Sequence, residues 1–127
     1  MSGRPAMEAG ADVVLVARTR NAALEKSIAA LGRRVASVAA DVGQPAAAAA
    51  ILREAEAAGL RPDILVNNAG IIRRAPFLEF SSADWNDVMD VNLGGAFRLS
   101  QAFAAGLVAR KARGSIVNVA SLLSFQG

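Results

Sequence analysis

The chain has 127 residues, of which 54% are hydrophobic and 5% aromatic, and it carries a formal net charge of +3. Its length suits one domain with a core of Ala, Val, Leu and Ile, and the absence of Cys and His excludes disulfides and removes the commonest metal ligands. We therefore expect no metal site. Because Arg and Lys form no dense stripe with interleaved aromatic residues, we expect no nucleic-acid partner either.

The N-terminal part of the chain predicts a soluble protein and a first strand. Residues 1–5 contain no long apolar segment of a secretory signal, and the apolar run Val13–Ala17 is too short to cross a bilayer. We therefore expect a cytoplasmic protein with no membrane partner. Val13–Ala17 is instead a predicted buried strand, and Asn21–Leu31 is a predicted helix that Gly32 ends.

Further strands and helices alternate along the rest of the chain. The predicted strands are Val35–Ala40, Ile64–Val66 and Ser115–Ala120, and the predicted helices are Ala46–Ala58 and a long one from Ser81 to Lys111. Gly94 and Gly95 interrupt the long helix and permit close packing against a neighbouring segment. Strands that alternate with helices indicate an α/β fold with a parallel sheet and right-handed crossovers.

The third predicted strand ends in two carboxamides and two small residues, Asn67-Asn68-Ala69-Gly70. In an open α/β sheet, ligands bind just beyond the carboxyl ends of the strands. Asn68 can donate and accept hydrogen bonds there without charge, and Ala69 and Gly70 let a flat ligand approach the backbone. A buried strand followed by a polar turn is the alternative interpretation.

Two other strand ends carry groups that suit the adenosine half of a dinucleotide. Arg18 follows the first strand, and with Ala17 in place of an acidic residue it can bind a 2′-phosphate, which favours NADP over NAD. Asp41 can accept a hydrogen bond from adenine, and Val42 can pack against the ring. A solvated Arg18, and an Asp41 that caps the following helix, are the alternatives.

Asn92 and Ser121 are the candidate catalytic residues. Asn is unfavourable within a helix because its side chain competes for backbone hydrogen bonds, so a helix kinked at Asn92 could hold a water that relays protons. Asn92 could equally be an exposed polar position. Ser121 follows the last predicted strand, where its hydroxyl could polarise a carbonyl. A hydrolase triad is excluded because the chain contains no His.

Three motifs make the chain resemble the short-chain dehydrogenase/reductase family. They are Asn67-Asn68-Ala69-Gly70, Ser81-x-x-Asp84-Trp85-x-x-Val88-x-x-Val91-Asn92 and Gly114–Ser121, and the similarity extends from about Ala9 to Gly127. The resemblance implies an NAD(P)-dependent oxidoreductase with a doubly wound parallel Rossmann sheet and helices on both faces, assembled as a homotetramer or homodimer. It also implies that Asn92 and Ser121 are catalytic. The cofactor-lining residues that it implies are Asp41, Val42, Asn68, Ala69 and Gly70.

Two segments, Asn68–Arg74 and Ala120–Gly127, are similar to the dehydrogenases of 2-deoxy-D-gluconate and 2-dehydro-3-deoxy-D-gluconate, which serve hexuronate breakdown. This similarity implies hydride transfer between nicotinamide and a keto or hydroxy sugar acid. Arg73 and Arg74 suit the carboxylate of such an acid, because a guanidinium can bind it with two hydrogen bonds. Gln126 is a further candidate substrate residue. The alternative for the two Arg residues is a solvated loop.

The chain also departs from the family pattern. The Gly-rich phosphate loop and the Tyr-x-x-x-Lys pair, which supplies the family's general acid and base, do not occur in the 127 residues. We therefore expect residues 1–127 to be a single incomplete Rossmann domain, without the family's first strand and C-terminal third, and to be inactive alone. The alternatives are a non-catalytic truncated fragment or pseudoenzyme, and a reductase of another substrate such as gluconate or a 3-oxoacyl thioester.

Overall fold

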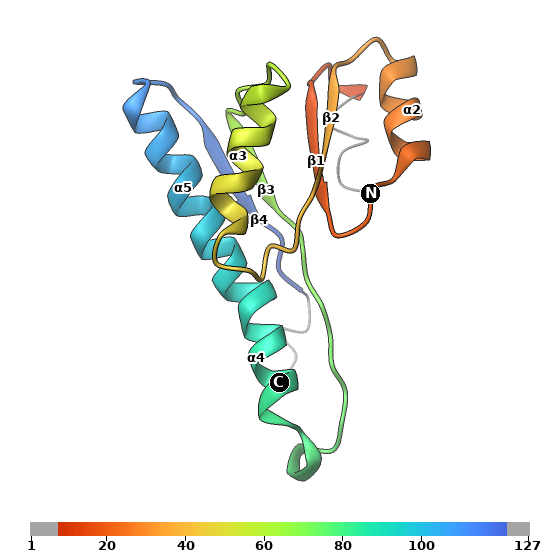
Figure 1. Ribbon diagram of the computed structural model, residues 1–127, viewed down its shortest axis with the longest axis vertical. Helices are drawn as coiled ribbons and strands as arrows, with labels where there is room; N and C mark the ends of the chain where they lie inside the picture. Colours follow the sequence, from red (N-terminus) through yellow and green to blue (C-terminus); the bar gives the residue numbers. More distant parts are fainter. Residues whose placement is uncertain (1–7, 122–127) are drawn as a thin grey trace. The chain divides into compact units, whose positions relative to one another are not determined.

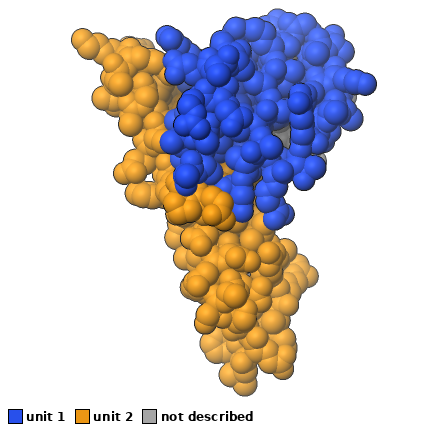
Figure 2. All heavy atoms as spheres, viewed as in Figure 1, with its two compact units in different colours: residues 1–41, 46–62 blue, residues 42–45, 63–127 orange. Residues whose placement is uncertain are grey.

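The computed structural model describes residues 8–121, whose strands and helices are labelled in Figure 1. The chain falls into two compact units, drawn in different colours in Figure 2. Unit 1 comprises residues 1–41 and 46–62, and unit 2 comprises residues 42–45 and 63–127. Each unit contains a two-stranded parallel sheet with at least one helix packed against it, which confirms the predicted α/β fold.

In unit 1, strand β1 (Val13–Ala17) pairs in parallel with β2 (Val35–Ala39). Helix α2 (Ala22–Ala30) connects the two strands, and helix α3 (Ala47–Ala57) follows β2. Both helices contact β2. The elements lie within two residues of the boundaries that the apolar patterns predict.

Local sequence signals set the ends of α2. The side chain of Asn21 accepts a hydrogen bond of 3.0 Å from the backbone N–H of Leu24 and so caps the helix. Beyond the other end, Gly32 adopts a φ of 70°, a left-handed conformation that glycine tolerates. The buried apolar side chains of the unit are Ile28, Val38, Ala47, Ala48, Ile51, Ala55 and Leu60.

In unit 2, β3 (Ile64–Asn67) pairs in parallel with β4 (Ser115–Asn118). The segment between them holds the 3-10 helix η1 (Phe77–Glu79), helix α4 (Ser82–Met89), the π-helix η2 (Asp90–Gly95) and helix α5 (Ala96–Ala109). Helix α5 contacts β3, and its Leu99 and Phe103 are buried. Asn67 lies opposite Asn118, so the residues that follow the two strands share one edge of the sheet.

The helix expected from Ser81 to Lys111 begins as predicted but is not uniform. Oγ of Ser81 accepts a hydrogen bond of 3.0 Å from the backbone N–H of Asp84, which caps α4. Figure 1 shows α4 and α5 following one another along one line, and the π-helix joins them. The helix ends at Ala109, before Lys111, whose φ is 53°. Where the sequence predicts a kink at Asn92, the helix instead contains a π-helical turn, a feature that often marks functional sites.

One face of the unit 2 sheet is apolar and open to solvent. Ile64 and Val66 of β3 are 59% and 45% exposed, and their neighbours Val117 and Val119 are exposed as well. Among the described residues, β3 pairs only with β4, and β1 only with β2. None of the helices in residues 8–121 has the length and apolar character needed to cross a membrane.

Candidate active site

The two carboxamides at the end of β3 have different environments. Nδ2 of Asn67 donates hydrogen bonds of 2.9 Å to Oγ of Ser100 and 2.8 Å to Oδ1 of Asn118, so Asn67 joins β3 to α5 and to β4. Asn68 follows the strand and is exposed. Asn67 is therefore part of the internal packing of unit 2, and Asn68 is the amide that remains open to a ligand.

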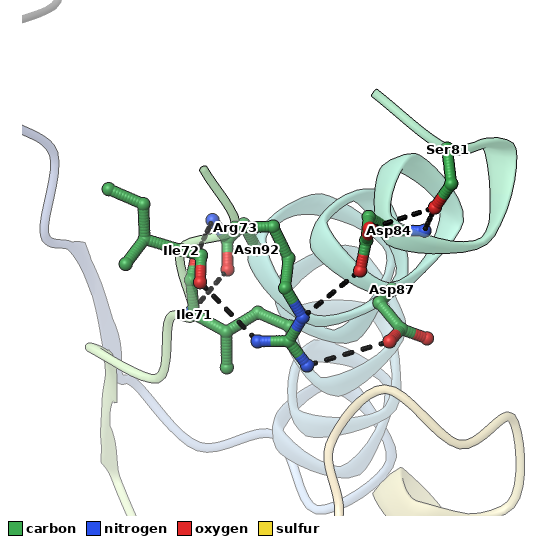
Figure 3. Close-up of polar contacts among 7 residues, drawn as sticks. All are labelled: Ile71, Ile72, Arg73, Ser81, Asp84, Asp87 and Asn92. Atoms are coloured by element: carbon green, nitrogen blue, oxygen red, sulfur yellow. Dashed lines mark hydrogen bonds and ion pairs between the residues drawn. The ribbon is translucent and has the colours of Figure 1, made fainter. Parts of the chain in front are cut away.

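Asn92 lies in the π-helix and is bound to the segment that follows β3. Its Oδ1 accepts a hydrogen bond of 2.8 Å from the backbone N–H of Ile71, and its Nδ2 donates one of 2.9 Å to the Ile71 carbonyl (Figure 3). A Cβ placed on Gly70 would lie 3.5 Å from Oδ1 of Asn92. The structure therefore brings together Gly70 and Asn92, which the sequence predicts as cofactor-binding and catalytic residues.

Arg73 is held by the first turns of α4. Its Nε lies 3.5 Å from Oδ1 of Asp84, its Nη2 lies 3.5 Å from Oδ2 of Asp87, and its Nη1 donates a hydrogen bond of 3.3 Å to the carbonyl of Ile72 (Figure 3). These partly exposed ion pairs are individually weak, but together they orient the guanidinium. Arg74 is exposed and makes no ion pair with any residue in the described range.

Two arginines follow β1 in unit 1, and they differ in whether a carboxylate binds them. Arg20 donates hydrogen bonds of 2.6 and 2.7 Å to the two carboxylate oxygens of Glu25, and these bonds lower the pKa of Glu25 from its ordinary value of 4.5 to about 2. Arg18 is exposed and forms no hydrogen bond or ion pair with another residue of the described range. Arg18 is therefore the arginine available to a ligand at this strand end.

The remaining predicted site residues lie at strand ends or outside the described range. Ser121 is exposed just beyond β4, at the edge where Ala69 follows β3. Asp41 and Val42 follow β2 and are both half-buried. Gln126 lies outside the described residues.

Sequence reasoning missed three polar partners near these residues. Asp84 and Asp87 bind Arg73, and their i, i+3 spacing on one helix face could have indicated a shared cation. Arg98 of α5 donates a hydrogen bond of 2.8 Å to the carbonyl of Gly43. The sequence signal for Arg98 is a charged residue between two apolar ones, Phe97 and Leu99.

Comparison with known proteins gives concordant matches. The sequence model of the short chain dehydrogenase family matches residues 3–127. The 2-dehydro-3-deoxy-D-gluconate 5-dehydrogenase of Escherichia coli K12 is 44% identical over 120 residues, which cover 94% of this chain and 47% of the relative. The chain thus spans about half the length of this relative and of two further 2-dehydro-3-deoxy-D-gluconate 5-dehydrogenases that it matches.

Two solved structures share the fold at high identity. A candidate 2-deoxy-D-gluconate 3-dehydrogenase of Agrobacterium tumefaciens with bound NADP is 49% identical, with a TM-score of 0.81 over 94% of this chain and 46% of that chain. A gluconate 5-dehydrogenase of Burkholderia cenocepacia, in complex with NADP and tartrate, is 40% identical, with a TM-score of 0.81 over 95% of this chain and 48% of that chain. With a family match over nearly its whole length and these strand-end residues in place, the chain belongs to the short-chain dehydrogenase family.

Proposed function

We propose that this chain supplies cofactor-binding and catalytic residues of an NADP-dependent oxidoreductase that acts on a sugar acid. The reaction is hydride transfer between C4 of the nicotinamide and a carbonyl carbon of a keto sugar acid. The observation that carries the proposal is the two-ended hydrogen bonding of Asn92 to Ile71. It binds the π-helix to the segment that follows β3, where an α/β sheet receives its ligand.

The strand-end residues fit a phosphorylated dinucleotide. Arg18 lies beyond β1 without an ion pair in the described range and is suited to a 2′-phosphate, which supports NADP over NAD. Asp41 and Val42 would contact the adenine. Asn68, Ala69 and Gly70 would line the nicotinamide side of the cofactor. NADP is bound in related structures from A. tumefaciens and B. cenocepacia, which supports the same assignment. The cofactor supplies the hydride, and the chain binds and orients it.

The proposed roles of the chain's own residues follow from their positions. Ser121 would donate a hydrogen bond to the carbonyl oxygen of the substrate, and the π-helical turn at Asn92, whose side chain is bonded to Ile71, would hold the water that relays a proton. The 127 residues contain no Tyr, so the family's general acid would have to come from residues beyond them. We therefore expect no measurable turnover from the 127 residues alone.

An arginine in the loop after β3 would recognise the carboxylate of the sugar acid. Arg73 is engaged by Asp84 and Asp87, which leaves Arg74 as the better placed of the two to bind a substrate carboxylate. The relative from B. cenocepacia was solved with tartrate, a dicarboxylate, which supports an acid-binding site in this group. Gln126 remains a candidate contact for the substrate hydroxyl groups.

The test uses the complemented chain, defined as the 127 residues joined to those segments of the E. coli relative that lie outside the match. Two substrates form a matched pair: 5-keto-D-gluconate and L-sorbose, which carries a hydroxymethyl group where the acid has its carboxylate. Initial rates with NADPH are measured for both, and for a 3-oxoacyl thioester. We expect a kcat/KM for the acid that is at least about tenfold higher than for L-sorbose, as one charge-assisted contact would give.

Three outcomes would contradict the proposal. A higher kcat/KM for the thioester would support the alternative function, a 3-oxoacyl thioester reductase. Equal kcat/KM values for 5-keto-D-gluconate and L-sorbose would show that the enzyme does not recognise the carboxylate. A folded complemented chain without activity on any of the three substrates would favour a non-catalytic polypeptide.

A further inference from the structure

Arg98 of unit 2 has a partly buried, charged side chain without a carboxylate partner in the described range. Its Nη2 donates hydrogen bonds of 2.8 Å to the carbonyl of Gly43 and 3.3 Å to the carbonyl of Asp90. Its Nε is buried and has no hydrogen-bond partner among the described residues. Partial burial of a guanidinium that has no counter-ion costs desolvation free energy. We therefore expect Arg98 to have a role that offsets this cost.

Two glycines beside Arg98 show how tightly this region is packed. A Cβ on Gly94 would lie 2.9 Å from Nη1 of Arg98, so the guanidinium rests directly on the helix backbone. A Cβ on Gly95 would lie 2.6 Å from the carbonyl oxygen of Val42, closer than real contacts allow. The Gly94-Gly95 pair therefore lets the turn Val42–Gly43 and the guanidinium both pack against the end of the π-helix η2, as the sequence predicts for close packing.

Arg98 thus connects the turn after β2 to the π-helix. Its guanidinium donates one hydrogen bond to the carbonyl of Gly43 in the turn and a second one to the carbonyl of Asp90, at the start of the π-helix. Both hydrogen bonds come from Nη2, so this one nitrogen of the guanidinium lies within reach of the two carbonyls.

We infer that Arg98 is a positioning residue for the adenosine half of the cofactor. It fastens the Val42–Gly43 turn to the π-helix so that Val42 presents a fixed surface to the adenine ring. This inference rests on the proposed function, because that function assigns the adenine contact to Val42. Arg98 itself touches neither cofactor nor substrate and acts through the Val42–Gly43 turn.

The experiment compares Arg98→Met with Arg53→Met in the complemented chain. Arg53 is an exposed residue of α3 and serves as the matched control. Calorimetry measures the Kd of 2′,5′-ADP, the adenosine half of NADP. Initial rates are measured with NADPH and with reduced nicotinamide mononucleotide, which lacks adenosine. We expect Arg98→Met to raise the Kd of 2′,5′-ADP and the KM of NADPH by about tenfold, because the turn loses a charged hydrogen bond and must then be ordered when the ligand binds. Turnover with the mononucleotide should stay at the parent's rate.

Two further variants separate positioning from general loss of folding. Arg98→Lys should lie between the parent and Arg98→Met, because Lys keeps a charged donor but its flexible stem holds that donor less firmly in place. Gly94→Ala should reproduce the defect, because its Cβ would displace the guanidinium. An unchanged Kd for 2′,5′-ADP in Arg98→Met, or an equal loss with the mononucleotide, would overturn the inference and leave the proposed function standing. A parent that binds no 2′,5′-ADP would instead refute the proposed cofactor site.

Discussion

The side chain of Asn92 pairs with the backbone of Ile71 at both of its polar ends, with hydrogen bonds of 2.8 and 2.9 Å. The amide therefore substitutes for a backbone strand neighbour of Ile71, and it fastens the segment after β3 to a π-helical turn. Asn is a poor helix residue because it competes for backbone bonds. Here the competing bonds are made to Ile71, and the helix takes the π form at that point.

The first prediction concerns this pair. Asn92→Ala removes both hydrogen bonds, so the backbone N–H of Ile71 should exchange with solvent faster and kcat should fall by about 10²-fold or more, the usual contribution of proton transfer by a placed group. Asn92→Asp keeps an acceptor for the Ile71 N–H but loses the donor to its carbonyl, so it should also be impaired. Both are measured in the complemented chain by hydrogen exchange and steady-state kinetics.

The matched control is Asn86→Ala, at an exposed position of α4. It should leave both the kinetics and the Ile71 exchange rate as in the parent. Retention of full kcat in Asn92→Ala with increased exchange at Ile71 would restrict Asn92 to a structural role.

The second prediction concerns the choice of cofactor. Arg18 is unpaired in the described range, whereas Arg20 is bound by Glu25, so only Arg18 should contact a 2′-phosphate. Arg18→Ala should lower the ratio of kcat/KM for NADPH to that for NADH by about 10- to 100-fold, the worth of a charge-assisted contact. Arg20→Gln should change this ratio little. Equal kcat/KM for the two cofactors in the parent would show that NADP is not preferred.

The third prediction separates the two arginines after β3. Arg74→Gln should raise KM for 5-keto-D-gluconate by about tenfold and leave kcat/KM for L-sorbose unchanged, because only the acid offers a carboxylate. Arg73→Gln frees Asp84 and Asp87 and loosens the loop, so both substrates should be affected alike. If Arg73→Gln alone raised KM for 5-keto-D-gluconate without affecting L-sorbose, Arg73 would be the residue that binds the carboxylate. Its ion pairs with Asp84 and Asp87 would then have to open when substrate binds.

Much of the fold follows from short-range sequence signals. The strand Val13–Ala17 is a continuous apolar run between polar residues, and its observed boundaries are those predicted. Helix α2 begins at a capping Asn21 and is followed by Gly32, both of which act within one helical turn. The parallel pairing follows from the alternation of strands and helices.

Contacts between distant residues were not predictable in the same way. The ion pairs of Arg73 and the hydrogen bond from Arg98 to Gly43 depend on how a loop and a helix meet. The spacing of Asp84 and Asp87 can indicate a shared cation, but no local pattern identifies the arginine that they bind or the carbonyl that Arg98 reaches. The π-helix was foreseen only as a kink, because the unfavourable Asn92 indicates a disturbance but not its geometry. Strand-end positions of the site residues were predictable because the carboxyl ends of parallel strands share one edge.

The fourth prediction concerns acid stability. Arg20 lowers the pKa of Glu25 to about 2 in the folded chain, from an ordinary value of 4.5. The carboxylate therefore contributes stability that is complete above pH 4.5 and is lost as the pH falls through about 2. The urea midpoint of Glu25→Gln should lie below that of the parent at neutral pH, and the difference should shrink toward pH 2.

The control is Glu54→Gln, at an exposed position of α3 without an ion pair in the described range. It should shift the midpoint little at any pH. A difference between Glu25→Gln and the parent that stays constant down to pH 2 would show that the pKa of Glu25 is not lowered.

The most direct test of the proposed oxidoreductase is the rate of carbonyl reduction by Ser121→Ala in the complemented chain, at saturating NADPH and 5-keto-D-gluconate. Ser115→Ala, an exposed substitution at the start of β4, is the matched control. If Ser121 holds the reacting oxygen, kcat should fall by about 10²-fold or more while the Kd of NADPH stays as in the parent, and Ser115→Ala should retain the parent's rate. A Ser121→Ala variant that reduces 5-keto-D-gluconate as fast as the parent would contradict the assignment of this strand edge as the catalytic site.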